Sequence, residues 1–180
     1  MIPSPHPPAL LFIVTGSQGA GKTTFCDQLI QAAREAGWKT AGVLSRPMFV
    51  GEARSGILVE DLHSGETRQL AMRSETPSPG SRHWKFDRDS LDWGNRVLAR
   101  STPVDLLVVD ELGPLEFERE DGWQAGLDAI DSRQYAIALV VVRAEMLGEV
   151  LVRWPDANVV EIDTPEESTR KARVLSEQLF

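Results

Sequence analysis

Apolar residues in this chain form two kinds of pattern that alternate from one end to the other. Continuous apolar runs are typical of strands buried on both faces of a parallel sheet, and they occupy residues 10–14, 40–44, 104–109, 136–142 and 158–162. Between them, apolar residues recur at helical spacing within residues 25–37, 87–100, 122–130, 144–152 and 164–179. The alternation predicts an α/β fold, a three-layer sandwich with a mostly parallel central sheet.

One segment interrupts this alternation. Residues 56–62 and 67–72 read as strands and flank His63-Ser-Gly-Glu66, so they predict an inserted β-hairpin. Residues 73–83 are turn formers without a periodic apolar face, which predicts a mobile loop. We therefore expect a single domain over residues 1–180, with a disordered leader at 1–9 and the inserted hairpin and mobile loop at 46–86.

Composition and charge narrow the class of protein. The chain has 180 residues, 42% of them apolar and 26% charged, as expected for one globular domain. A formal net charge of −8 opposes nonspecific binding to nucleic acid or to an anionic membrane. The sequence has no signal-peptide pattern and no run of about eighteen apolar residues, so we expect a cytoplasmic protein without a membrane partner.

A phosphate-binding motif lies between the first strand and the first helix. Residues 16–23 match G-x-x-x-x-G-K-[ST], in which backbone N–H groups surround the β-phosphate. Lys22 is expected to reach the β- and γ-phosphate oxygens and Thr23 to ligate Mg²⁺. The alternative is a glycine-rich turn that binds nothing. The predicted nucleotide-binding residues are Gly16, Ser17, Gln18, Gly19, Ala20, Gly21, Lys22, Thr23 and Thr24.

Two adjacent acids end the strand at 104–109. Asp110 lies where a phosphate-binding-loop enzyme needs a carboxylate for the magnesium ion, so Thr23 and Asp110 are the predicted metal residues. Glu111 is predicted to orient and deprotonate a water in line with the γ-phosphate. The alternative is that both acids only cap a helix or turn. With the phosphate loop upstream, the pair favours hydrolysis over phosphoryl transfer.

Arg143 is the candidate for a further positive charge on the γ-phosphate, because it directly follows the strand at 136–142. The alternative is a surface arginine that begins a helix. Arg46, Arg54, Arg82 and Lys85 are candidates for a lid over the nucleotide, although each alone is typical of a solvated surface charge.

Several separated segments resemble the cancer-related nucleoside-triphosphatase family of small P-loop NTPases. These are the phosphate loop, Gly42-Val-Leu-Ser45, the hairpin at 56–70 and, most specifically, Val109-Asp-Glu-Leu-Gly-Pro-Leu-Glu116, which is similar to the family's Walker B segment. The resemblance implies the additional-strand, catalytic-glutamate division of the fold, Mg²⁺, and slow hydrolysis of ATP, GTP and other nucleoside triphosphates. The chain departs from the family in the loop 73–84 and at Ser168-Thr-Arg170, where the family has an asparagine-arginine pair.

The leading hypothesis is therefore an Mg²⁺-dependent nucleoside-triphosphate phosphatase in which Lys22, Glu111 and Arg143 are catalytic. A second hypothesis is a nucleoside or nucleotide kinase with an acceptor held by the hairpin and residues 73–89. A third is a nucleotide-binding adaptor whose hydrolysis accelerates only with a protein partner. The sequence lacks an Asn-Lys-x-Asp stretch, which argues against dedicated guanine recognition and leaves the base preference open.

Overall fold

The continuous apolar runs all form strands that lie side by side in one sheet. The computed structural model describes residues 9–74 and 84–180, and in this part of the chain the sheet has eight strands in the order β5-β4-β3-β2-β6-β7-β1-β8. The strands are β1 (Leu10–Thr15), β2 (Thr40–Val50), β3 (Ala53–Asp61), β4 (Thr67–Arg73), β5 (Trp84–Phe86), β6 (Val104–Leu112), β7 (Tyr135–Val142) and β8 (Asn158–Glu161).

The central pairs of the sheet are parallel. β2 pairs with β6, β6 with β7, β7 with β1, and β1 with β8. The strand before the phosphate loop, β1, is thus separated by β7 from the strand that carries Asp110, β6. This is the additional-strand arrangement that the family resemblance implied. Because parallel strands end at one edge of a sheet, the residues that follow β1, β6 and β7 lie at that edge.

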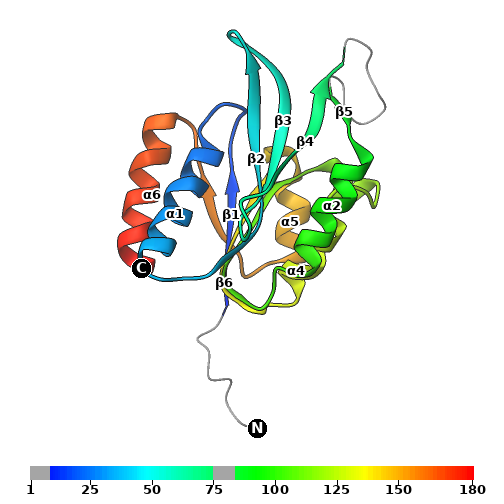
Figure 1. The fold of residues 1–180 in the computed structure, drawn as a ribbon. Coiled ribbons are helices and arrows are strands. Elements are labelled where there is room, and N and C mark those ends of the chain that lie inside the picture. Colours follow the sequence, from blue (N-terminus) through cyan, green and yellow to red (C-terminus); the bar gives the residue numbers. More distant parts are fainter. Residues whose placement is uncertain (1–8, 75–83) are drawn as a thin grey trace.

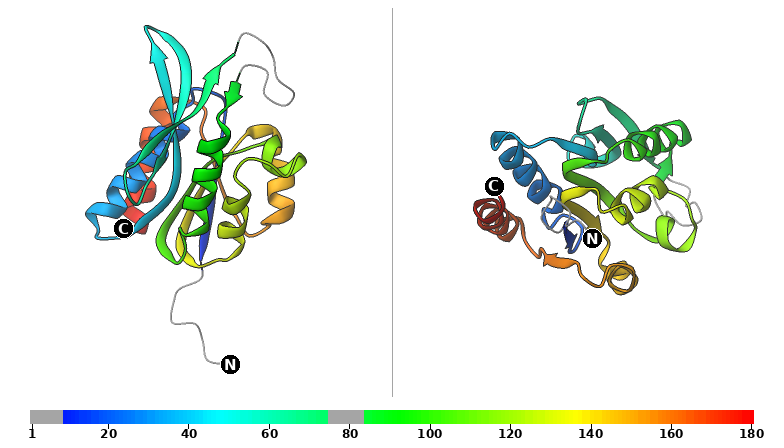
Figure 2. Two further views of the ribbon diagram at one scale, coloured as in Figure 1. Left: turned by 45° about the vertical axis from the view of Figure 1, so that its right-hand side comes forward. Right: turned by 90° about the horizontal axis from the view of Figure 1, so that it is seen from below.

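Helices cover both faces of the sheet, as predicted (Figures 1 and 2). One core, around Phe25, Leu29 and Ile30, packs α1 and α6 against the sheet. The other, around Trp93, Leu127 and Val150, packs α2, α4 and α5 on the opposite face. The three-layer prediction is confirmed. The helices are α1 (Lys22–Glu35), α2 (Arg88–Ala99), α3 (Pro114–Glu118), α4 (Gln124–Asp131), α5 (Leu147–Arg153) and α6 (Pro165–Leu179), with a 3₁₀ turn, η1 (Ala144–Met146), before α5.

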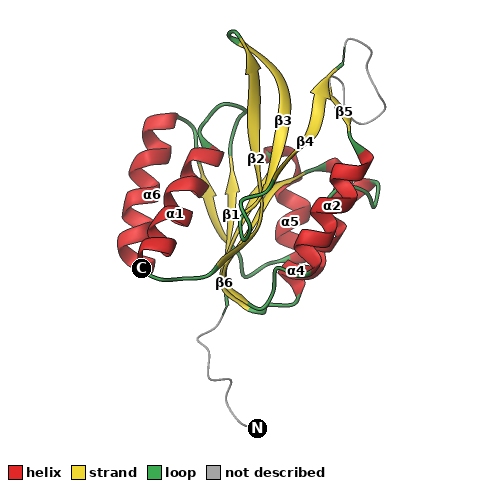
Figure 3. Ribbon diagram, viewed as in Figure 1, coloured by secondary structure: helices red, strands yellow, loops and turns green. Residues whose placement is uncertain are grey.

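The antiparallel part of the sheet is larger than the sequence predicted. The hairpin of β3 and β4 is present, but β2 also continues to Val50 and forms a second hairpin with β3 (Figure 3). Pro47 argues against a strand there, because proline cannot donate to a sheet ladder. β2 pairs with β6 only through Val43, so Pro47 lies where one side of the strand is a free edge and proline is tolerated.

Two short elements were not predicted, α3 and β5. β5 pairs with β4 through three residues, too few for a period to be read from the sequence. Residues 1–8 of the leader predicted at 1–9, and residues 75–83 of the loop predicted at 73–83, lie outside the described residues. Ala9 packs against the core and Arg73 ends β4. Among the described helices, none has the length and apolar character needed to cross a membrane.

Candidate phosphate-binding and catalytic site

The backbone of the phosphate loop requires glycine at its first position. Gly16 has φ +139°, and a Cβ there would lie 2.0 Å from the carbonyl oxygen of Ile162. The loop therefore passes directly against the end of β8, and α1 begins at Lys22 immediately afterwards. Its first-turn N–H groups have no partner within the helix, so they carry a partial positive charge toward the loop.

Lys22 lies over this loop. Its Nζ donates to the carbonyl oxygens of Gly16 at 2.8 Å and Ser17 at 3.0 Å. Thr23 and Thr24 belong to the first turn of α1, Ser17, Gln18 and Gly19 are exposed, and Ala20 is buried. The predicted nucleotide-binding residues thus form one continuous loop and helix start at the end of β1.

The last helix, α6, contacts the phosphate loop through a hydrogen bond. The hydroxyl of Ser168 in α6 is fully buried and donates to the carbonyl oxygen of Gly21 at 2.8 Å. α6 begins after Thr164, whose side chain caps the helix by accepting from the N–H of Glu167 at 3.2 Å. Ser168, part of the segment that departs from the family pattern, therefore links α6 to the phosphate loop.

Asp110 lies near the end of β6 and is only 3% exposed. Its Oδ2 accepts from the backbone N–H of Ser45 at 3.1 Å, and its carbonyl oxygen accepts from the Ser45 hydroxyl at 2.8 Å. Burial, and next the charge of Glu111, raise the pKa of Asp110 to about 7, while the Ser45 N–H and the charge of Lys22 act in the opposite direction. A buried carboxylate in this environment is stabilised by a cation.

Glu111 and Arg143 face each other across the ends of β6 and β7. Arg143 Nε lies 3.3 Å from Glu111 Oε1, and both side chains are partly exposed. The backbone N–H of Arg143 donates to the carbonyl oxygen of Leu112 at 3.1 Å, which fixes where the arginine leaves β7. The structure thus brings together two residues that the sequence analysis selected separately.

The predicted lid arginines have different surroundings. Arg46 makes a bidentate ion pair with Asp27 of α1, with both distances 2.8 Å, and its Nε donates to Glu60 at 2.6 Å. It therefore fastens α1 to β2 and β3. The guanidinium of Arg54 lies 5.1 Å from the centre of the Trp84 ring. Arg82 lies outside the described residues.

Sequence reasoning assigned no role to Ser45 or Glu116, although both lie in segments that carried the family resemblance. Ser45 contacts Asp110 because β2 and β6 are neighbours, and that adjacency is not visible in a single sequence. Glu116 is 5% exposed and bonds two backbone N–H groups. The available signal was a glutamate among apolar residues, in the four-residue stretch Pro-Leu-Glu-Phe.

A phosphate loop after β1, a buried aspartate at the end of β6 and one strand between them define an α/β P-loop NTPase. Residues 11–175 match the NTPase family, and the chain belongs to this family. Relatives in this family are named nucleoside triphosphatases, and the protein is therefore a nucleoside triphosphatase.

The chain is similar to "Nucleoside-triphosphatase THEP1" from several organisms. It is 30% identical to the Caldivirga maquilingensis protein over 71% of this chain and 73% of that protein, and 28% identical to the Thermotoga maritima protein over 91% and 92%. The solution structure of a human cancer-related nucleoside triphosphatase shares the fold, with a TM-score of 0.71 and 21% identity, covering 94% of this chain and 97% of that one. The crystal structure of THEP1 from Aquifex aeolicus has a TM-score of 0.65 and 16% identity, covering 94% and 99%.

Proposed function

We propose that this nucleoside triphosphatase is Mg²⁺-dependent and hydrolyses ATP, GTP and other nucleoside triphosphates to the diphosphate and inorganic phosphate. The observation that carries the proposal is the pair of acids at the end of β6. Asp110 is buried and interacts electrostatically with Lys22, whereas the adjacent Glu111 is partly exposed beside Arg143. These surroundings support Asp110 as the carboxylate that holds a cation and Glu111 as the carboxylate that water can reach.

The residues present fit a magnesium ion. Mg²⁺ prefers oxygen ligands and keeps several waters, taking one or two carboxylates plus phosphate oxygens. Thr23 supplies a hydroxyl and Asp110 a carboxylate, and the described residues contain no cluster of three or more histidine, cysteine or acidic side chains that would suit another metal. When bound, Mg²⁺ supplies charge neutralisation on the β- and γ-phosphate oxygens.

The residues of the chain carry out the remaining steps. The loop N–H groups and Lys22 hold the β- and γ-phosphates in line with a water molecule. Glu111 accepts a proton from that water while the water oxygen forms a bond to the γ-phosphorus. The bond from the γ-phosphorus to the bridging oxygen breaks, and its electron pair leaves on the β-phosphate of the diphosphate. Arg143 stabilises the charge on the γ-phosphoryl group, and Glu111 returns its proton to solvent.

The family assignment supports hydrolysis over the kinase and adaptor hypotheses, because the similar proteins are named for triphosphatase activity. No base-recognition residue is assigned, so we propose a broad nucleotide range. The cytoplasmic location and the absence of nucleic-acid and membrane partners stay predictions from the sequence.

The test is phosphate release from ATP, GTP, CTP and UTP by the purified protein, with Mg²⁺ or with EDTA. We expect release of phosphate and diphosphate in equal amounts with every nucleotide, abolished by EDTA. Release confined to one base would contradict the broad range, and release that persists in EDTA would contradict the Mg²⁺ dependence. Turnover only with an added nucleoside acceptor, or only with a cell extract, would favour the kinase or the adaptor instead.

A further inference from the structure

Glu116 has a buried carboxylate that the proposed mechanism does not use. It lies in α3, the short helix that follows Asp110 and Glu111 and the turn at Gly113, and is 5% exposed. One oxygen, Oε2, accepts from the backbone N–H of Gly113 at 2.8 Å, and the other, Oε1, accepts from the backbone N–H of Trp123 at 2.9 Å. Both bonds join the ends of the segment 113–123 to one side chain.

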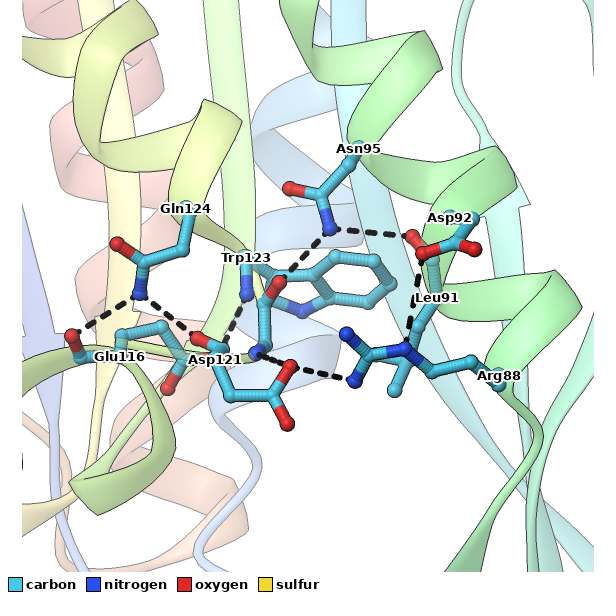
Figure 4. Close-up of polar contacts among 9 residues, drawn as sticks. Arg88, Leu91, Asp92, Asn95, Glu116, Asp121, Trp123 and Gln124 are labelled. Atoms are coloured by element: carbon cyan, nitrogen blue, oxygen red, sulfur yellow. Dashed lines mark hydrogen bonds and ion pairs between the residues drawn. The ribbon is translucent and has the colours of Figure 1, made fainter. Parts of the chain in front are cut away.

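The C-terminal end of the segment 113–123 is fixed to α2 by hydrogen bonds (Figure 4). The side-chain amide of Asn95 donates to the carbonyl oxygen of Gly122 at 2.8 Å, and its oxygen accepts from the N–H of Ala125 at 3.0 Å. Gln124 Nε2 donates to the carbonyl oxygen of Glu116 itself at 3.1 Å. Asn95 of α2 and Gln124 of α4 therefore hold the backbone of Gly122 and of Glu116 in place.

The N-terminal end of the segment 113–123 contacts the candidate catalytic pair, Glu111 and Arg143. A Cβ added to Gly113 would lie 3.2 Å from both Cδ and Nε of Arg143, so the Arg143 side chain packs directly on the Gly113 backbone. The same Nε lies 3.3 Å from Glu111. The chain of contacts runs from Glu116 through Gly113 to Arg143 and from there to Glu111.

From these contacts we infer that Glu116 is a positioning residue for hydrolysis, which holds the Gly113 turn so that Arg143 and Glu111 are aligned with the γ-phosphate. Glu116 donates nothing to the substrate and does not contact the phosphate loop in the described structure. This inference rests on the proposed roles of Glu111 and Arg143. It predicts a defect in turnover without a defect in nucleotide binding, because binding depends on the loop at β1 and α1.

The test uses two variants and a matched control in the full chain. Glu116→Gln keeps the size of the side chain but places an amide N–H group against one of the two backbone donors. Gly113→Ala leaves Glu116 intact and displaces Arg143, and Gly113 has an extended backbone, φ −152°, that alanine also adopts. Glu118→Gln is the control, since Glu118 is an exposed glutamate of the same helix.

We expect Glu116→Gln and Gly113→Ala each to lower kcat by about 10- to 100-fold, as small misplacements of reacting groups do. The Kd for a fluorescent triphosphate analogue should change less than about twofold, and Glu118→Gln should match the wild type. In an Arg143→Ala background, Glu116→Gln should lower kcat by less than about threefold, because residues that act through one another are not additive.

Three results would overturn the inference: wild-type kcat in Glu116→Gln, a kcat loss explained by a smaller folded fraction in thermal melts, or full additivity with Arg143→Ala. If Glu116→Gln does not fold, Gly113→Ala decides between the same results. Glu111→Gln is measured in parallel to separate the two claims. An active Glu111→Gln contradicts the proposed role of Glu111 as the base, whereas an inactive Glu111→Gln beside a fully active Glu116→Gln contradicts only the role of Glu116.

Discussion

The guanidinium of Arg143 lies 3.3 Å from the carboxylate of Glu111, although Glu111 belongs to the end of β6 and Arg143 directly follows β7. The ion pair is partly exposed, so its direct contribution to stability is small, about 0–1 kcal/mol. The ion pair is important because it lies at the edge of the sheet where the strands β1, β6 and β7 end. An arginine beside the candidate base is suited to contact the γ-phosphoryl group and to orient Glu111.

Replacing Arg143 by alanine should therefore reduce kcat by about 10²- to 10³-fold, the usual cost of a preorganised charge stabiliser. The Kd for the nucleoside diphosphate should be unchanged, because Arg143 is proposed to contact only the γ-phosphoryl group. Steady-state kinetics and titration with the diphosphate check this. Arg133→Ala is the matched control, as Arg133 precedes the other end of β7 and pairs with Asp156 at 2.7 Å. Equal losses in the two variants would contradict the assignment.

Ser45 should matter to the metal site through Asp110. Ser45→Ala removes the hydroxyl that donates to the Asp110 carbonyl oxygen at 2.8 Å but keeps the N–H bond to the carboxylate. We expect Mg²⁺ to bind about tenfold more weakly, as when groups that orient metal ligands are lost. Activity measured against Mg²⁺ concentration tests this. Ser101→Ala is the control, because it removes a buried hydrogen bond of the same length, from the Ser101 hydroxyl to the carbonyl oxygen of Val97 in α2. A similar weakening of Mg²⁺ binding in Ser101→Ala would contradict a specific effect of Ser45 on Asp110.

Asp110 should lower the stability of the metal-free protein at neutral and higher pH. Burial and the charge of Glu111 raise the pKa of Asp110 from its ordinary value of 3.8 to about 7 in the folded state. The folded state thus holds this proton more tightly than the unfolded state, and the stability it contributes at low pH is lost as the pH rises through about 7. The free energy of unfolding of Asp110→Asn should therefore gain about 1–3 kcal/mol relative to the wild type as the pH rises from about 4 to about 7, and the difference should then stay constant. Urea unfolding in EDTA measures this, and a pH-independent difference would refute it.

Gly42 sets the close approach of β2 to β6, and hence of Ser45 to Asp110. It has φ +110°, and a Cβ there would lie 1.9 Å from the carbonyl oxygen of Val108. Gly42→Ala should cost about 3 kcal/mol or more in the free energy of unfolding, since backbone would have to move. Gly37→Ala places a methyl at φ +82° with nothing within 4 Å and should cost about 1 kcal/mol. Chemical denaturation measures the free energy of unfolding of both variants. Equal losses in Gly42→Ala and Gly37→Ala would show that the positive φ, and not the contact with Val108, causes the destabilisation.

The chemistry of this site was more predictable than its geometry. The phosphate loop is a local motif, so Gly16, Lys22 and Thr23 are readable from residue types and spacing alone. Asp110, Glu111 and Arg143 are readable because each follows a continuous apolar run, and parallel strands end at one edge. That β7 lies between β1 and β6 follows from pairing over long sequence distances, which the apolar pattern does not specify; only the family resemblance indicated it.

The residues that support the site were harder to predict for the same reason. Ser45 reaches Asp110 across two paired strands, and Glu116 bonds Trp123 across a turn. Pro47 obscured the outer half of β2, because a proline normally ends a strand and only the free edge beyond Val43 permits it. Side chains whose partners are backbone groups elsewhere leave little trace in spacing or composition.

The most direct test of the proposed mechanism is the substitution Glu111→Gln, which keeps the shape of the side chain and removes its ability to accept a proton. Binding of a triphosphate and release of phosphate are measured on the same preparation with Mg²⁺ present. We expect triphosphate binding as in the wild type and a loss of phosphate release of at least about 100-fold. Phosphate release at the wild-type rate would show that Glu111 is not the base and would contradict the proposed mechanism.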